Sequence, residues 1–250
     1  MKSTHSLTTD RPALDRSLAT VAEVALTYPQ AISVLNRLQI DYCCQGRKSF
    51  REACSKAGLD EIKVWQEIES TAPSLEPVHL ENWDTLMLVD YILNHHHTYV
   101  RQSTPQLLEL LDKICSVHGS DTPTLFLVRE EFQKLADELT SHLPKEEEVL
   151  FPAIQHLNKL SKFEISHHNF LSRLDAPIEV MEHDHDAAGD LLKSIRAKTN
   201  QFTPPSFACP TFQITDKLLE EFETDLMQHV HIENNILFPK VKQIINEATK

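Results

Sequence analysis

The sequence is poor in glycine and in basic residues, and it has no long apolar run. Only 4 of the 250 residues are glycine, which favours a helical protein over one built from many tight turns. The net charge of −13 argues against a nucleic-acid or anionic-membrane partner, because both require a basic face. No stretch reaches the ~18 apolar residues of a membrane span. The polar N-terminus also lacks the apolar core of a secretory signal.

Cysteine is scarce too, and its placement does not suggest a disulfide framework. The five cysteines are an odd, scattered set, so a cytoplasmic, reducing compartment is expected. Cys43 and Cys44 are adjacent, and a disulfide between neighbours is strained. The residues alone leave two interpretations of this pair equally open: redox or iron-transfer thiols, or two small buried side chains at a turn. We expect Cys54, Cys115 and Cys209 to be structural.

The pattern along the chain predicts two domains. Residues 14–70 predict a small helical N-terminal domain, with a capping box that starts at Ser49 and a helix cap at Asp60. A proline-containing linker is expected over residues 71–79. The second domain, residues 80–248, contains four long amphipathic segments. The expected helices cover residues 83–117, 122–160, 177–199 and 211–248.

Four such helices with short or moderate connections favour an all-α fold, an antiparallel four-helix bundle. Pro123 suits the first position of a helix, and the third expected helix starts at about Pro177. Pro105 and Pro144 lie inside expected helices, and each should kink its helix. Residues 161–176 show no clear pattern and stay unassigned.

The most informative feature is a repeat within the bundle. The pattern H-x3-E-x3-L-F-P occurs twice without a gap, from His142 to Pro152 and from His229 to Pro239. A pair at i and i+4 lies on one helix face, ~6 Å apart along the axis. Such a pair can direct an imidazole and a carboxylate to one point in the core.

Each expected helix places one histidine in an otherwise apolar stripe, at 100° per residue. Two helices add a glutamate one turn later. The predicted metal ligands are therefore His97, His142, Glu146, His185, His229 and Glu233. By the same test, His95, His96, His183 and His231 lie off the core stripe. Glu147, Glu148 and Glu182 should be solvated helix charges.

These six residues predict a pair of metal ions. Buried carboxylates without partners cost several kcal/mol each, and metal binding offsets that cost. Six ligands are too many for one tetrahedral zinc ion. They suit two ions bridged by Glu146 and Glu233, and imidazole with carboxylate favours iron over manganese or zinc. A lone histidine on an apolar face is usually not a ligand, but the joint pattern is far more specific.

These residues resemble a known family. The bundle resembles the hemerythrin-like di-iron domain, and nearly the whole chain resembles the RIC (repair of iron centres) family of the ScdA/YtfE type. The resemblance rests on the sequence Asp41-Tyr-Cys-Cys-Gln-Gly46, both H-x3-E repeats, the segment from Met181 to Gly189, and Thr203-Pro-Pro205. It implies the same six ligands and two non-haem, carboxylate-bridged iron ions.

The resemblance also implies a function. It favours repair of iron–sulfur clusters damaged by nitrosative or oxidative stress, by iron donation, with Cys43 and Cys44 as redox or iron-transfer thiols. The expected partners are damaged iron–sulfur proteins, with nitric oxide or dioxygen as small ligands and a second copy of the chain in a homodimer. Two alternatives remain open: a di-iron nitric-oxide reductase, and a sensor that binds dioxygen or nitric oxide.

Overall fold

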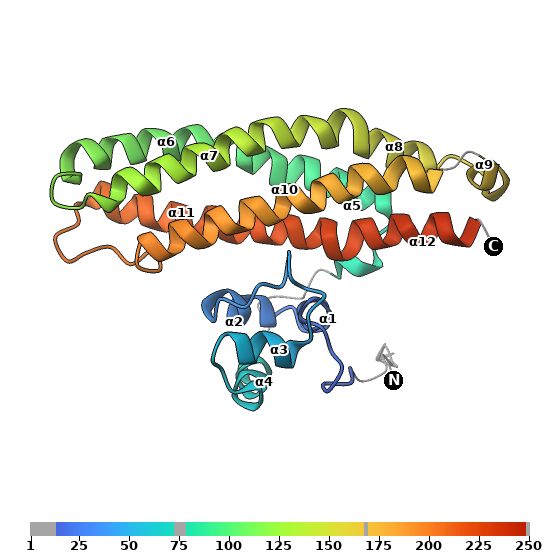
Figure 1. Cartoon of the computed structure of the whole chain (residues 1–250), viewed down its shortest axis with the longest axis horizontal. Coiled ribbons are helices and arrows are strands. Elements are labelled where there is room, and N and C mark those ends of the chain that lie inside the picture. Colours follow the sequence, from blue (N-terminus) through green and yellow to red (C-terminus); the bar gives the residue numbers. More distant parts are fainter. Residues whose placement is uncertain (1–13, 73–78, 168–169, 249–250) are drawn as a thin grey trace, which may run out of the picture. The chain divides into compact units, whose positions relative to one another are not determined.

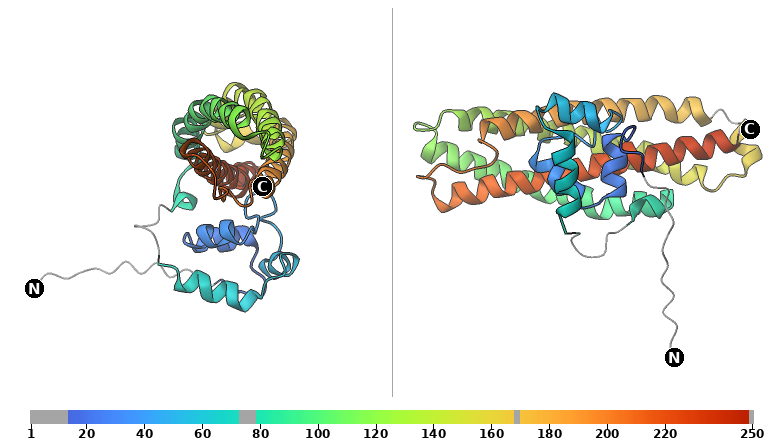
Figure 2. Two further views of the ribbon diagram at one scale, coloured as in Figure 1. Left: turned by 90° about the vertical axis from the view of Figure 1, so that its left-hand side faces the viewer. Right: turned by 90° about the horizontal axis from the view of Figure 1, so that it is seen from below.

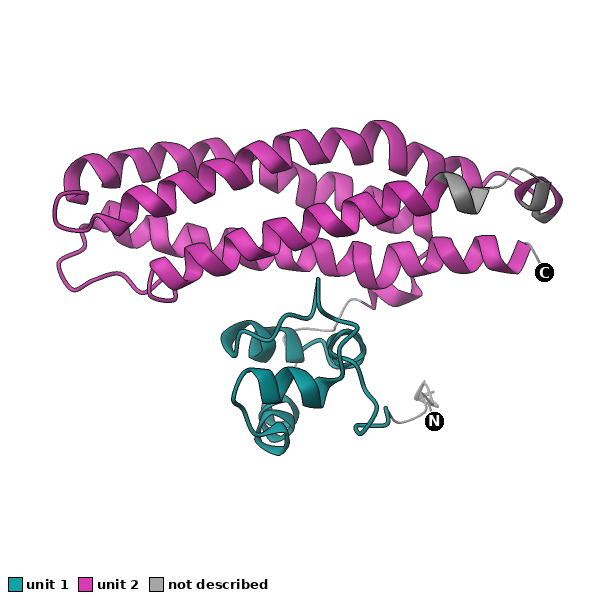
Figure 3. Ribbon diagram, viewed as in Figure 1, with its two compact units in different colours: residues 1–77 teal, residues 78–250 magenta. Residues whose placement is uncertain are grey.

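The computed structural model describes residues 14–72, 79–167 and 170–248. The chain divides into two compact units, Met1–Pro77 and Val78–Lys250 (Figure 3). All regular structure in the described ranges is helical, and the all-α prediction is confirmed. Most of the predicted linker, residues 73–78, lies outside the described residues.

The first unit contains four short helices: α1 (Val21–Thr27), α2 (Ala31–Arg37), α3 (Phe50–Lys56) and α4 (Glu61–Ser70). Side-chain caps fix where three of them begin. Thr20 forms a capping box with Glu23 at α1, Ser49 caps α3 and Asp60 caps α4. Their apolar faces enclose a small core that contains Trp65.

In the described ranges, the second unit is a bundle of four long helical rods (Figures 1 and 2). The first rod runs through α5 (Thr85–Tyr91), η2 (Ile92–His97) and α6 (Thr98–His118), after the short turn η1 (Leu80–Asn82). The second runs through α7 (Thr124–Lys145), η3 (Glu146–Leu150) and α8 (Phe151–Leu157). The third is α10 (Phe170–Lys198), and the fourth runs through α11 (Pro210–Ile232), η4 (Glu233–Leu237) and α12 (Phe238–Ala248).

The rods pack in a ring around one apolar core. Helix α7 contacts α6 and α10, and α11 contacts the same two helices. Large aromatic side chains, among them Phe132, Phe151, Phe222 and Phe238, are fully buried between them. The core therefore surrounds any polar group that the rods direct inward.

One sequence expectation was wrong at the start of the third rod. Helix α10 begins at Phe170 rather than at Pro177, which lies inside it. The unassigned stretch also contains a separate short helix, α9 (Lys162–His167). Leu174 and Ile178 are buried on either side of Pro177, so packing maintains the helix although proline removes one backbone hydrogen bond.

Three of the rods contain a π-helical turn, η2, η3 or η4. Each of these wider turns holds one predicted ligand: His97, Glu146 or Glu233. Such turns are rare in helices and are frequent at functional sites. They mark one level of the bundle as the place where the regular helical register changes.

Candidate metal centre

The six predicted ligands meet in the bundle core. Their residues are between 0% and 4% exposed, although all six are polar or ionisable. They form two groups of four in which every ligand atom lies within 4.8 Å of the others. Both groups contain Glu146 and Glu233, so each glutamate can bridge two ions.

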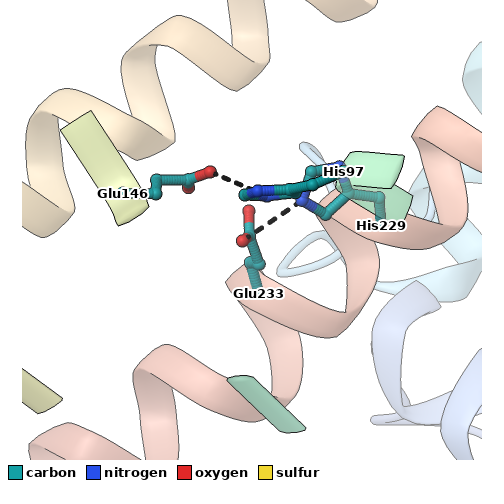
Figure 4. A group of neighbouring side chains, drawn as sticks. All are labelled: His97, Glu146, His229 and Glu233. Carbon is teal, nitrogen blue, oxygen red and sulfur yellow. Dashed lines mark ion pairs between the residues drawn. The ribbon is translucent and has the colours of Figure 1, made fainter. Parts of the chain in front are cut away.

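The first group adds His97 from η2 and His229 from α11 (Figure 4). Nε2 of His97 lies 3.3 Å from Oε2 of Glu146. Nε2 of His229 lies 3.2 Å from Oε1 of Glu233. Each imidazole thus faces the carboxylate that would share its ion.

The second group adds His142 from α7 and His185 from α10. Nε2 of His142 lies 3.2 Å from Oε1 of Glu146, one turn later on the same rod. Nε2 of His185 lies 3.1 Å from Oε2 of Glu233. The four carboxylate oxygens are therefore divided evenly, one toward each histidine.

The donor set fits a pair of transition-metal ions. In the described part of the chain, both oxygens of each glutamate, and Nε2 of His97 and His229, are buried without a hydrogen-bond partner. Unpartnered buried groups of this kind are rare and costly. Nitrogen and oxygen donors without sulfur suit iron, and two ions would satisfy all of these atoms together.

Three of the four histidines are held by a hydrogen bond from the other ring nitrogen. Nδ1 of His97 lies 2.7 Å from Oε1 of Glu147, and Nδ1 of His142 lies 3.2 Å from Oδ2 of Asp184. Nδ1 of His185 lies 2.9 Å from Oδ1 of Asn234. With Nε2 on a metal, Nδ1 is the protonated donor, and such contacts orient ligand rings.

These contacts overturn one prediction and add residues that the sequence did not reveal. Glu147 is not a solvated charge, because it joins His97 to Arg101, whose guanidinium lies 2.8 Å away. Asp184 and Asn234 adjoin predicted ligands in sequence, and that adjacency is the only signal that could have indicated them. Glu147 and Asn234 occupy the variable position directly after the glutamate of each repeat, and Asp184 lies outside the repeats, so the fixed residues of the pattern did not reveal them.

His229 is supported differently. Its Nδ1 has no hydrogen-bond partner among the described residues. Instead the ring of His96 lies parallel to it, with centroids 5.3 Å apart and an interplanar angle of 3°. The prediction that His96 and His231 lie off the core was wrong, since they are 0% and 3% exposed. The π-turn η2 turns both His96 and His97 inward.

The charges of the site compensate one another before any metal binds. Burial and the charge of Glu233 raise the pKa of Glu146, but the adjacent imidazoles of His142 and His97 outweigh them and leave it lowered. Burial lowers the pKa of His142, but Glu146 outweighs this and raises it to about 9. Burial also lowers the pKa of His229, which stays below its usual value. The glutamates are thus ionised and ready to bind cations.

A cavity of about 170 Å³ reaches the centre from the side of α7, α10 and α11. Three predicted ligands, His142, His185 and His229, are among its lining residues. Ala187 and Ala188 also line it, and their small side chains leave room beside the rings. The cavity can admit a molecule of a few atoms to the histidine side of the centre.

In the first unit, the two adjacent cysteines lie at the turn after α2. Their sulfurs are 3.5 Å apart, whereas a disulfide bond measures about 2.05 Å. Oδ1 of Asp41 accepts hydrogen bonds from the Cys43 thiol at 3.3 Å and from the Cys44 backbone N–H at 2.9 Å. Ligand atoms of these three residues lie within 4.8 Å of one another. The Cys44 contact and burial raise the pKa of Cys43, so its thiol is protonated at neutral pH.

The other cysteines lie apart from this turn. Cys54 is buried in the first unit, and burial raises its pKa to about 11. Cys115 is buried in the bundle. Cys209 is partly exposed at the start of α11, where its Sγ lies 3.2 Å from Nε2 of His118.

Comparison with known proteins gives a family for each unit. Residues 88–241 match the hemerythrin family, described as a hemerythrin HHE cation binding domain. Residues 17–72 match ScdA_N, described as a domain of unknown function. No helix in the described ranges is long and apolar enough to cross a membrane.

Individual relatives extend over both units. The protein named iron–sulfur cluster repair protein YtfE of Yersinia pseudotuberculosis serotype IB (strain PB1/+) is 33% identical over 230 residues, which cover 91% of this chain and 98% of the relative. The YtfE protein of Yersinia pestis (strain Pestoides F) is 32% identical with the same coverage. The chain therefore belongs to the hemerythrin HHE family of di-iron proteins and, within it, to the YtfE-type proteins with an N-terminal ScdA_N domain.

Proposed function

We propose that this chain repairs iron–sulfur clusters by donating iron from a centre bound by His97, His142, Glu146, His185, His229 and Glu233. One observation carries the proposal: two His-His-Glu-Glu groups share both glutamates in the bundle core. The names of the YtfE relatives supply the reaction class. When bound, iron would be the material that is donated, and the affinity of the site for it would depend on its oxidation state.

The protein's own residues account for holding and releasing iron. Glu146 and Glu233 supply the negative charge that binds two cations, and Glu147, Asp184 and Asn234 orient three of the imidazoles. Protonation of the same imidazoles competes with metal, because His142 gains a proton readily when no ion is bound. Protons and iron therefore compete for the same ring nitrogens of the site.

Cys43 and Cys44 fit a role in transferring iron or electrons. With Asp41 they form another group of side chains that could hold a metal ion. The raised pKa of Cys43 means that a metal ion must displace its proton on binding. We assign the pair to a transient step of transfer rather than to storage.

An anaerobic reactivation assay tests the donor function. Iron-loaded protein is mixed with a dehydratase whose cluster has been damaged by nitric oxide or an oxidant, and the recovered dehydratase activity is measured. We expect recovery above that given by the same amount of free Fe(II), and loss of the effect in Glu146→Gln. Glu148→Gln, which alters an exposed neighbour, is the matched control. Recovery no better than the free-iron control would rule out donation.

The cavity of about 170 Å³ favours a second candidate, reduction of nitric oxide, because a diatomic molecule fits beside His142, His185 and His229. Nitrous oxide is measured under turnover with a reductant. Production of no more than one equivalent rejects this activity. Reversible dioxygen binding without loss of iron would instead favour the third candidate, a sensor.

The remaining assignments belong to the same proposal. The damaged iron–sulfur protein is the partner, the chain acts in the cytoplasm, and it forms a homodimer. Light scattering of the iron-loaded protein at several concentrations tests the dimer, and a monomer throughout contradicts it. Cell fractionation tests the compartment.

A further inference from the structure

We propose that His95, His96 and Asp225 form a third metal site, which binds one divalent first-row ion such as Fe(II) beside the di-iron centre. The two histidines lie on the π-turn η2, and the aspartate lies on α11 in the neighbouring rod. One nitrogen of each histidine and one oxygen of the aspartate lie within 4.8 Å of one another. The closest pair is Nδ1 of His96 and Oδ1 of Asp225, at 3.0 Å.

This group is largely buried and still has an atom that can bind a ligand. His96 is 0% exposed, and the Asp225 side chain is 15% exposed. Across the described ranges, Oδ2 of Asp225 is buried and has no hydrogen-bond partner. A buried polar atom without a partner costs about 1–3 kcal/mol, more when it is charged. The same kind of unpartnered atom marks the di-iron centre itself.

The chemistry of the three side chains selects the ion. Two imidazoles and one carboxylate are the ligand set of mononuclear non-haem Fe(II) sites, which keep open coordination positions. His95 is exposed, so one side of the site faces solvent. A site of this kind binds more weakly and exchanges faster than the two fully buried groups, which share two carboxylates.

If Asp225 and His96 only supported the His229 ring, the position of His95 would have no explanation, whereas a metal site explains it. The His96 ring lies against His229, so the aspartate could simply hold that ring in place. That role does not involve His95, whose ring stacks on Tyr91 and lies edge-on to His96. His95 therefore distinguishes the two roles, because a metal site uses this residue and a support for His229 does not.

The site lies next to the di-iron centre, which suggests a role in moving iron to or from that centre. Through the stacked rings of His96 and His229, it adjoins the wall of the di-iron centre. An ion bound there would be an iron entering or leaving the pair, and this use rests on the proposed donor function. The existence of the site does not rest on it, since metal binding and cluster repair are measured separately.

Mn(II) binding to the iron-loaded protein tests the site. Both buried groups are first filled with iron, and a Cys43→Ser, Cys44→Ser background removes the other cluster outside the core. Bound Mn(II) is then counted from the loss of the free-ion signal in electron paramagnetic resonance. We expect one bound Mn(II) per chain, and at least a tenfold loss of affinity in His95→Ala and in Asp225→Asn. His156→Ala removes another exposed histidine on a helix and should leave binding unchanged.

The iron content and optical spectrum of each variant are recorded in parallel. Retention of two irons in His95→Ala, together with loss of Mn(II), supports a separate third site. Absence of Mn(II) binding in the parent protein overturns the proposal, as does unchanged binding in both variants. Failure of the reactivation assay alone would reject the donor function and leave the metal site in place.

Discussion

Nδ1 of His97 and Oε1 of Glu147 lie 2.7 Å apart, and this contact joins a predicted ligand on the first rod to the residue after Glu146 on the second. Glu147 also binds Arg101, so its carboxylate is anchored on both sides. Hydrogen bonds from Arg101 foremost, then from His97, outweigh partial burial and lower the pKa of Glu147. It therefore stays ionised and keeps the His97 proton on Nδ1, which leaves Nε2 available for iron.

Replacement of this carboxylate should weaken iron binding. We expect Glu147→Ala to lower iron affinity by about 10–100-fold, the usual effect of losing a contact that orients a metal ligand. Glu147→Gln, which keeps an acceptor oxygen, should lose less. Competition with a chromophoric chelator measures both. Glu148→Ala is the matched control, and an equal loss there would show that helix charge, not the contact with His97, is responsible.

Helical periodicity explains how far the sequence could predict this site. The repeat and the apolar stripes indicated all six residues that the structure brings together, since each stripe is interrupted by one histidine. Periodicity of 100° per residue failed at His96, because a π-turn rotates each residue by less and turns both His96 and His97 inward. No local signal distinguishes a π-turn from an ordinary turn, so Glu147 could not be separated from Glu148.

The same comparison applies to the fold. The all-α bundle was predictable because long amphipathic patterns report on the buried face of each rod. The start of α10 was not, since Pro177 suits a first helical position, and only packing of Leu174 and Ile178 shows that the helix begins earlier. Local rules predict where a helix can begin, and tertiary contacts decide where it does.

Iron affinity should rise with pH. In the metal-free chain the pKa of His142 is about 9, above its ordinary 6.5, so at neutral pH this imidazole carries a proton that iron must displace. His97 and His185 are shifted in the same direction: burial lowers each pKa, and a glutamate outweighs it. Fe(II) affinity, measured anaerobically with a chelator of known pH dependence, should increase from pH 6.5 towards about 9. An affinity independent of pH would contradict this charge arrangement.

The ion pair between Arg196 and Glu223 should contribute strongly to stability. Glu223 is 2% exposed, and the Arg196 guanidinium donates to both carboxylate oxygens, with Nε 3.0 Å from Oε1 and 2.7 Å from Oε2. Arg196→Met leaves a carboxylate buried and unpaired, which should cost about 3–5 kcal/mol in the free energy of unfolding.

Urea denaturation measures the effect of the Arg196 substitution. Lys193→Met, on the exposed face of the same helix, is the control and should change stability by less than about 0.5 kcal/mol. Adding Glu223→Gln to Arg196→Met should recover part of the loss, because the unpaired charge is removed. A cost for Arg196→Met no larger than the control would contradict a buried pair.

The partly exposed Cys209 should be the most reactive thiol of the bundle, although the sequence predicted only a structural role for it. The contact with His118 lowers its pKa to about 7, and the backbone N–H groups of Phe212 and Thr211 at the start of α11 add to that effect. Its alkylation rate by iodoacetamide, followed by peptide mass spectrometry, should rise with pH to a midpoint near 7, while the buried Cys115 reacts slowly at every pH. His118→Phe keeps a ring against Phe212 but removes the nitrogen, so the midpoint should move towards the ordinary value of 9.0. A midpoint near 9.0 in the unsubstituted protein would show that the histidine does not stabilise the thiolate.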